Sequence, residues 1–203
     1  MMSDQIINNL KKECNWIDER HPIFDYTVQS SGHRYAIALA GYAVDPLNDN
    51  DPIYHYSFEH NKYQLGQDKY RINTYGISCW KEYEQRLIAS FGASQTTPVY
   101  MCDHSHIVLS LTDFGDAFDS GMIGFAFTDY GKEIDLSVLE KELRKYQDYL
   151  NEEVYCFLHA DENGDAVEIC DYFYGSDFER NGLMDFLPEI LHEPLKTFSS
   201  YGH

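Results

Sequence analysis

The stretch LSVLEKELRKYQDYLNEEVYCFLHADENGDAVEICDYFY, from Leu136 to Tyr174, decides the fold. Its first part repeats apolar residues at intervals of three and four, at Leu136, Leu139, Leu143, Tyr146 and Leu150. This spacing places the apolar side chains on one face of an α-helix of about four turns. Ser137 and Glu140 match a capping box at the start of that helix.

The second part of the stretch predicts two antiparallel strands joined by a tight turn. Residues 154–159 and 166–174 are rich in apolar and aromatic residues that favour strands. Between them, the pair Asn163-Gly164 supplies the positive φ angles that a tight hairpin turn needs. A helix next to a hairpin indicates an α+β fold, in which the amphipathic helix packs on one face of an antiparallel sheet.

The N-terminal quarter of the chain predicts one helix and a second hairpin. A helix is expected over residues 3–20, ended by His21-Pro22, because proline disfavours helix in the residue before it. Residues 23–29 and 34–44 are expected to form a hairpin. Residues 45–52, DPLNDNDP, have the composition of a loop. The sequence therefore predicts an N-terminal extension, residues 1–52, before an acidic α+β core domain, residues 53–203.

The centre of the chain predicts strands around a second helix. Residues 53–75 are rich in Tyr and Phe and are interpreted as strands with a turn near Gly66. Residues 78–91 carry aromatic and apolar side chains at helical spacing, and Gly92 is a typical stop signal. Two more strands are expected, over residues 99–111 and 122–129.

Composition places the chain among globular proteins. Its 203 residues, 43% of them hydrophobic, are enough to bury a substantial core. No run of 18 apolar residues and no signal-peptide pattern occurs, which predicts a cytoplasmic protein with no membrane span. The five cysteines are odd in number and widely spaced, so reduced thiols are expected rather than a disulfide framework.

The negative charge of the chain lies mainly in its second half. The formal net charge is −19. Residues 1–100 contain 12 Asp and Glu against 9 Lys and Arg, whereas residues 101–203 contain 22 against 6. Such an excess repels nucleic acid and attracts basic clefts, and salt weakens both effects. The plain alternative is a solvating surface without a partner. Aromatic residues make up 15% of the chain, which is more than acidic disordered tails usually contain.

Two groups of acids are the candidate partner-binding residues. No Lys or Arg falls between Asp148 and Asp171, so nothing nearby in the sequence neutralises the acids there. The second group precedes the strand expected at 122–129. The candidates are Asp113, Asp116, Asp119, Asp148, Glu152, Glu153, Asp161, Glu162, Asp165, Glu168 and Asp171.

An enzymatic alternative rests on Cys102, His104 and His106, which alternate along the strand expected at 99–111 and would share one face. Such side chains are soft-metal ligands, although strand neighbours alone rarely complete a site. An acidic surrounding disfavours a reactive thiolate. Consecutive residues of a strand point to opposite faces, so Asp103-His104-Ser105 cannot form a catalytic triad. No phosphate-binding glycine loop occurs either. The sequence therefore predicts no catalytic residue, metal or cofactor.

Five ordered segments resemble a family of small, mostly uncharacterised proteins of bacteriophages, plasmids and integrative elements of Gram-positive bacteria. The resemblance covers roughly residues 58–185. The chain keeps the family's Asp-His-Ser at 103–105, its Asp-Ser-Gly at 119–121 and its Phe-Tyr-Gly at 173–175, and it departs at Gln67, His106, Ala117-Phe118 and Asp171-Tyr172. The segments are HNKYQLG at 60–66, VYMCDHSHIVLS at 99–110, FDSGMIGFAF at 118–127, YQDYLNEEVYCF at 146–157 and CDYFYG at 170–175.

The resemblance implies a mobile genetic element inside a bacterial host, and the charge points to a basic partner. Restriction and CRISPR nucleases bind DNA phosphates with Lys and Arg. We therefore expect an anti-restriction or anti-CRISPR inhibitor that mimics DNA and binds no nucleic acid itself. A metal-dependent hydrolase or nuclease using Cys102, His104 and His106 is the alternative, and a homodimer is compatible with the sequence.

Overall fold

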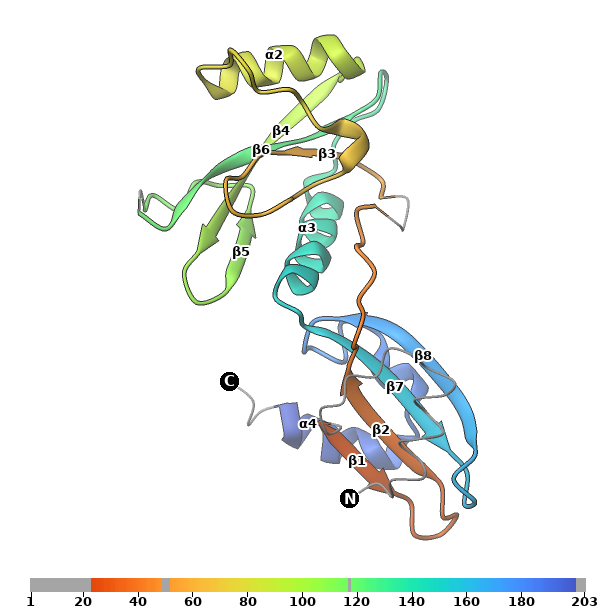
Figure 1. The fold of residues 1–203 in the computed structure, drawn as a ribbon. Coiled ribbons are helices and arrows are strands. Elements are labelled where there is room, and N and C mark those ends of the chain that lie inside the picture. The colour runs from red at the N-terminus through yellow and green to blue at the C-terminus, as the bar shows by residue number, and fades with distance from the viewer. Residues whose placement is uncertain (1–22, 49–51, 117, 200–203) are drawn as a thin grey trace. The chain divides into compact units, whose positions relative to one another are not determined.

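The computed structural model of the chain describes residues 23–48, 52–116 and 118–199. These residues form two compact units, each built on a four-stranded antiparallel sheet (Figure 1). Unit 1 comprises the described parts of residues 1–44 and 152–203, and unit 2 comprises those of residues 45–151. The predicted α+β class with antiparallel pairing and packed helices is confirmed. The helix expected at residues 3–20 lies outside the described residues.

The sheet of unit 1 joins the two ends of the described chain. Its strand order is β1 (Phe24–Thr27), β2 (Arg34–Leu39), β7 (Val154–Ala160) and β8 (Ala166–Tyr174). Both predicted hairpins are present, as β1–β2 and β7–β8. The two hairpins are joined by the long-range pairing of β2 with β7, in which Ile37 lies opposite Phe157.

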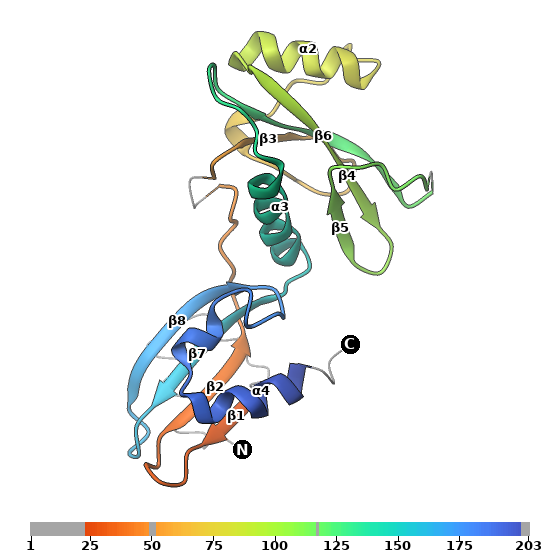
Figure 2. The same ribbon diagram turned by 180° about the vertical axis from the view of Figure 1, so that it is seen from behind.

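Short helices cover one face of this sheet. They are η2 (Leu183–Phe186), η3 (Glu189–Leu191) and α4 (His192–Ser199), which follow β8 in the chain (Figure 2). Apolar side chains from these helices and from all four strands make one buried cluster, because each strand presents alternate residues to the covered face. Its members include Phe24, Ile37, Phe157, Phe173, Leu183, Leu191 and Leu195.

The grouping of the chain differs from the division at residue 52 that the sequence suggested. Residues 23–39 pair with residues after 152 and not with those after 53, so they are half of a sheet and not a separate extension. Residues 45–151 form a separate unit, which in the sequence is inserted between the two segments of unit 1.

Unit 2 has a sheet with a helix on each face. Its strand order is β3 (His55–Phe58), β6 (Ser120–Thr128), β4 (Gln95–Asp103) and β5 (Ile107–Ser110). The predicted helix α3 (Leu136–Leu150) has the expected bounds and packs Leu139, Leu143 and Tyr146 against one face, whereas Leu136 is exposed. The helix α2 (Trp80–Phe91) packs near the other face through Tyr83 and Leu87, against Phe125 and Phe127 of β6. In both views of the ribbon, α2 and α3 lie on opposite sides of the sheet (Figures 1 and 2).

The strand β6 passes unusually close to β3 at Gly124. Gly124 has φ of 145°, and a Cβ atom built there would lie 2.2 Å from the backbone oxygen of Ser57. The ladder between β4 and β6 shifts register at the same level, between Val99 and Tyr100. Only a residue without a side chain fits this crossing.

Several local expectations are corrected by the structure. Residues 53–75 contain one strand, β3, followed by irregular chain and the short helix η1 (Asp68–Tyr70). The strand expected at 99–111 is a hairpin, β4–β5, with a turn at residues 104–106. The N-cap of α3 is Asp135, whose carboxylate accepts hydrogen bonds from the N–H groups of Ser137 and Val138, and not the expected capping box. Gly92 ends α2 in a left-handed conformation, as predicted.

Candidate functional site

Three of the candidate acids gather in the loop between β7 and β8. Asp161, Glu162 and Asp165 occupy this five-residue connection, in which Gly164 has φ of 88°. The side chain of Asp161 accepts hydrogen bonds from the N–H groups of Asn163 (2.8 Å) and Asp165 (3.0 Å). The bond from Asp165 is the main reason why the pKa of Asp161 lies below its usual range. Glu162 and Asp165 are exposed. The loop therefore presents ionised carboxylates on an ordered backbone.

Two histidines lie beside these acids. His33 Nδ1 and His159 Nε2 are 2.8 Å apart, and His33 Nε2 lies 3.6 Å from a carboxylate oxygen of Glu162. The His159 ring stacks on Tyr35, with ring centroids 4.5 Å apart. Burial, followed by the charge of His33, lowers the pKa of His159, although the nearby Glu168 and Asp161 act in the opposite direction. This pair joins the β1–β2 loop to strand β7, and His33 also reaches Glu162 in the β7–β8 loop. Sequence reasoning did not single the pair out.

The remaining acids of unit 1 do not join the loop in one patch. Glu168 is exposed on β8, opposite His159 in the ladder, and so lies near the loop. Glu152 and Glu153 precede β7, whose seven residues separate them from Asp161 by roughly 23 Å at the usual rise of a strand. Asp171 lies on β8, and its side chain is outside the description.

Asp148 is a correction to the expected acidic surface. It lies on α3 in unit 2 with 6% of its surface exposed, so its carboxylate is not presented to solvent. The number of acids in a stretch of sequence does not show which of them face solvent and which face the core once the stretch forms a helix.

The second acidic group lies in the loop between β5 and β6, in unit 2. Asp113 and Asp116 are exposed, and each binds nearby backbone: Asp113 accepts from the N–H of Gly115 and Asp116 from the N–H of Phe118, both at 2.9 Å. The ring of Phe118 is 97% exposed, which is unusual for a side chain of this type.

Asp119, the third acid of that group, binds a histidine from the β4–β5 turn. Its Oδ2 atom lies 2.9 Å from Nδ1 of His104, and its backbone oxygen accepts a hydrogen bond of 2.8 Å from the N–H of Asp103. A carboxylate on Nδ1 favours the tautomer in which Nε2 is the basic nitrogen. The triplets Asp-His-Ser at 103–105 and Asp-Ser-Gly at 119–121 are thus in direct contact.

Asp103 is held by residues of the segment that follows β3. Lys62 Nζ and Tyr63 OH both donate to Oδ2 of Asp103, at 3.0 and 3.1 Å. The bond from Lys62 is the first cause of the lowered pKa of Asp103, and the same bond raises the pKa of Lys62. His60 stacks on Tyr63 with centroids 5.1 Å apart, and burial lowers the pKa of His60.

These side chains surround a pocket of about 290 Å³ in unit 2. The lining residues come from three segments of the chain, at 60–62, 101–103 and 118–123. They include His60, Lys62, Asp103, Phe118, Asp119 and Ser120. Among these lining residues, only Asp119 was selected from the sequence as a partner-binding residue. For His60 and Lys62, the available signal was their place in the segment HNKYQLG.

The structure does not support the expected set of Cys102, His104 and His106. Cys102 lies on β4, whereas both histidines lie in the turn after it, so the three side chains do not share a strand face. Within the residues that the structure describes, no three or more His, Cys, Asp or Glu side chains are arranged to hold a metal ion.

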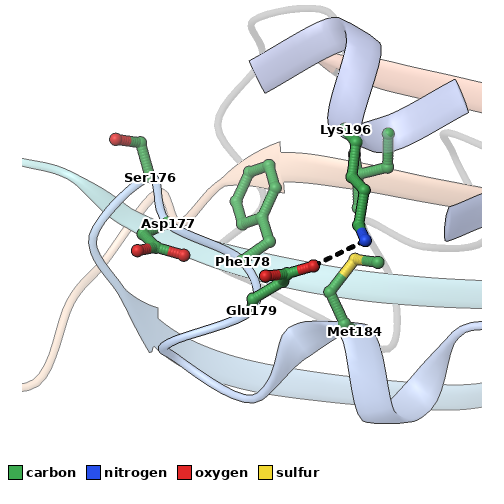
Figure 3. Close-up of a pocket in the computed structure, with 7 residues that line it drawn as sticks. Ser176, Asp177, Phe178, Glu179, Met184 and Lys196 are labelled. Carbon is green, nitrogen blue, oxygen red and sulfur yellow. Dashed lines mark ion pairs between the residues drawn. The ribbon is translucent and has the colours of Figure 1, made fainter. Parts of the chain in front are cut away.

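A second pocket lies in unit 1, between the segment after β8 and α4 (Figure 3). Its volume is about 460 Å³. Phe178, Met184 and Leu195 are buried and form its apolar part, and Lys196 binds Glu179 at 2.8 Å at its edge. The apolar lining belongs to the core cluster of unit 1, which indicates that this hollow is a structural gap beside α4.

Comparisons with known proteins leave the function to be argued from these residues. Neither a family model nor a curated protein nor a solved structure matches the chain. In the described part of the chain, every helix is too short or too polar to cross a membrane.

Proposed function

We propose that this protein is an inhibitor that binds a DNA-targeting nuclease of a bacterial host, such as a restriction or CRISPR effector, and occupies its basic DNA-binding surface without catalysing a reaction. One observation carries the proposal: residues 152–203 contain 12 Asp and Glu but only two Lys and Arg. A chain segment with this charge attracts a surface that has evolved to bind phosphates.

The fold of unit 1 supports binding by a preformed acidic surface. The acids at the β7–β8 loop stand on a sheet with a buried apolar core and not on a flexible tail. Their carboxylates are therefore positioned before the partner arrives, which reduces the ordering cost of association. DNA places one phosphate about every 3.4 Å along each strand, so acids along a strand and its loop can match several basic residues of a DNA-binding groove.

Competition between the protein and DNA is the direct test. A panel of purified restriction and CRISPR effectors is loaded with fluorescently labelled duplex, and the protein is added at 50 to 300 mM salt. We expect displacement of the DNA from at least one effector, with an affinity that falls steeply as salt rises. Tight binding that ignores salt and leaves the DNA bound would contradict mimicry and indicate an allosteric inhibitor.

A matched pair of charge reversals locates the surface. Glu162→Lys with Asp165→Lys changes the loop of unit 1, whereas Glu133→Lys with Glu140→Lys makes the same change in net charge at exposed positions of unit 2. The first variant should lose competition and the second should keep most of it, because salt-screened attraction depends on where the charge lies. Circular dichroism checks that both variants fold. Equal losses would show that only the total charge matters.

A further inference from the structure

We propose that the pocket of unit 2 lined by His60, Asp103, Phe118 and Asp119 binds the guanidinium group of an arginine side chain. This inference rests on the proposed function, because a basic DNA-binding surface is the source of such arginines. It assigns a specific ligand to a site outside the acidic loop of unit 1.

The charges at the pocket leave one carboxylate without a cation. Lys62 binds Oδ2 of Asp103, and Tyr63 donates to the same oxygen. Asp119 uses its Oδ2 for His104. Among the described residues, the Oδ1 atoms of Asp103 and Asp119 accept no hydrogen bond. The residues that line the pocket include two carboxylates, Asp103 and Asp119, and one ammonium group, that of Lys62. One added cation would balance the site.

An aromatic ring at the same pocket narrows the choice of cation. Phe118 is almost fully exposed and also lines the pocket beside Asp119. A guanidinium group is planar, so it can stack on an aromatic ring while its edge donates two hydrogen bonds to a carboxylate. An ammonium group cannot make both contacts with the same geometry. The pair of Phe118 and Asp119 therefore favours arginine over lysine.

The carboxylates and the backbone of Phe118 are held in place before a ligand arrives. The N–H of Phe118 is held by Asp116, and the N–H of Asp103 is bound to the backbone oxygen of Asp119. His104 restrains the side chain of Asp119. On binding, the exposed ring of Phe118 is the main protein group that remains to be ordered, so even a small probe should bind measurably.

The competing ligand for this pocket is an anion such as phosphate, held by Lys62 and His60. The ammonium group of Lys62 is already engaged by Asp103, and the charge of Asp119 also acts on it. Both carboxylates would repel an anion at this distance. We therefore take arginine as the ligand and use phosphate as an arm of the test.

The test is an NMR titration of the whole, ¹⁵N-labelled protein at pH 8 and low salt. The probe is N-acetyl-arginine-N′-methylamide, compared with its lysine and citrulline counterparts and with inorganic phosphate. Citrulline matches arginine in shape but carries no charge. We expect arginine to shift the amide signals of Asp103, Phe118 and Asp119 with a Kd in the millimolar range, on the order of that for a few weak contacts. Lysine should bind about threefold more weakly, and citrulline and phosphate should not shift these signals.

Three variants separate the pocket from the general acidity of the chain. Asp119→Asn should raise the Kd for the arginine probe about fivefold, and Phe118→Ala about threefold, as expected for an exposed cation–π contact. Asp113→Asn removes a charge from the same loop but outside the pocket lining, and should leave the Kd unchanged. The rest of each spectrum shows whether the variant is folded.

Three results would overturn the proposal: equal shifts from arginine and citrulline, tighter binding of phosphate than of arginine, or an equal loss of affinity in all three variants. The titration contains no nuclease, so its outcome is independent of the inhibitor assay. Arginine binding without nuclease competition would retain the pocket and contradict the proposed function. Competition with DNA in the absence of arginine binding would support the proposed function and contradict the arginine pocket.

Discussion

The two units share an architecture but use their acids differently. Each is a four-stranded antiparallel sheet, and each contains 17 Asp and Glu, with 6 Lys and Arg in unit 1 and 9 in unit 2. In unit 2 several acids have basic partners nearby, as in Lys62–Asp103, Arg71–Asp68 and Lys132–Asp129. In unit 1 the acids of the β7–β8 loop bind backbone or lie near histidines. The two units therefore differ in how their acids are neutralised locally and not in how many acids they contain.

The two units also differ in the features that affect their stability. Unit 2 has a close backbone crossing at Gly124 and buried polar bonds, and unit 1 contains His159, whose pKa is lowered by burial. The following experiments should affect one unit and spare the other.

The largest effect is expected from Gly124→Ala in unit 2. The new Cβ would lie 2.2 Å from the backbone oxygen of Ser57, at a φ of 145° that alanine rarely adopts. We expect a loss of about 3 kcal/mol in the free energy of unfolding. Hydrogen exchange followed by mass spectrometry should show faster exchange in β3 and β6 and unchanged exchange in β2 and β7.

Gly121→Ala is the matched control for that change. Gly121 lies on the same strand, and a Cβ atom there meets nothing within 4 Å. The control should unfold at nearly the same denaturant concentration as the parent protein. Faster exchange in both units of the Gly124 variant would show that the units unfold together. It would contradict the expectation that this change affects unit 2 alone.

A smaller loss in unit 2 is expected from Gln67→Leu. Gln67 is buried, its Oε1 accepts from the N–H of Tyr56 at 2.9 Å and its Nε2 donates to the backbone oxygen of Leu47 at 2.9 Å. Removing the amide leaves both backbone groups buried without these bonds, which costs about 2 kcal/mol. Urea denaturation measures the change. An unchanged midpoint would mean that water replaces both bonds.

The cap of α3 gives a still smaller effect. Asp135→Ala removes the acceptor for the N–H groups of Ser137 and Val138, so the melting temperature should fall by a few degrees. Ser137→Ala should lower it less, because its hydroxyl only supports Asp135. A larger loss for Ser137 would restore the capping box that the sequence suggested.

The pH dependence should distinguish unit 1, with the smallest effect of the series. Because burial lowers the pKa of His159 in the folded protein, the unfolded chain binds more protons near the usual histidine pKa. Stability should therefore be present above about pH 6.5 and decrease as the pH falls below it. We expect a lower melting temperature at pH 5.5 than at pH 7.5, and a smaller difference in His159→Phe. An identical pH dependence in that variant would show that His159 is not its source.

The sequence predicted those helices and hairpins that are determined by residues close together in the chain. Apolar spacing predicted α2 and α3, the stop at Gly92 predicted the end of α2, and the turn residues between apolar runs predicted the two hairpins of unit 1. The pairing of β2 with β7 could not be predicted, because nothing in the sequence of either strand identifies a partner strand more than 100 residues away.

The site was harder to predict than the fold for the same reason. The contact between Asp103 and Lys62 and that between His104 and Asp119 join loops that are distant in sequence. Asp148 was misassigned because burial of one helical residue depends on tertiary packing. The acids at 161–165 could be placed in advance because they belong to a hairpin loop.

The pairing of β2 with β7 has a consequence for how the chain acquires its structure during synthesis. The β2 strand is made early, but its partner follows more than 110 residues later, so the sheet of unit 1 must close a long loop. All strands of unit 2 lie inside that loop and can pair as soon as they leave the ribosome. We therefore expect unit 2 to fold first and to shorten the effective loop for unit 1. Until residue 160 at the end of β7 has emerged, β2 has an unpaired edge that invites contact with other nascent chains.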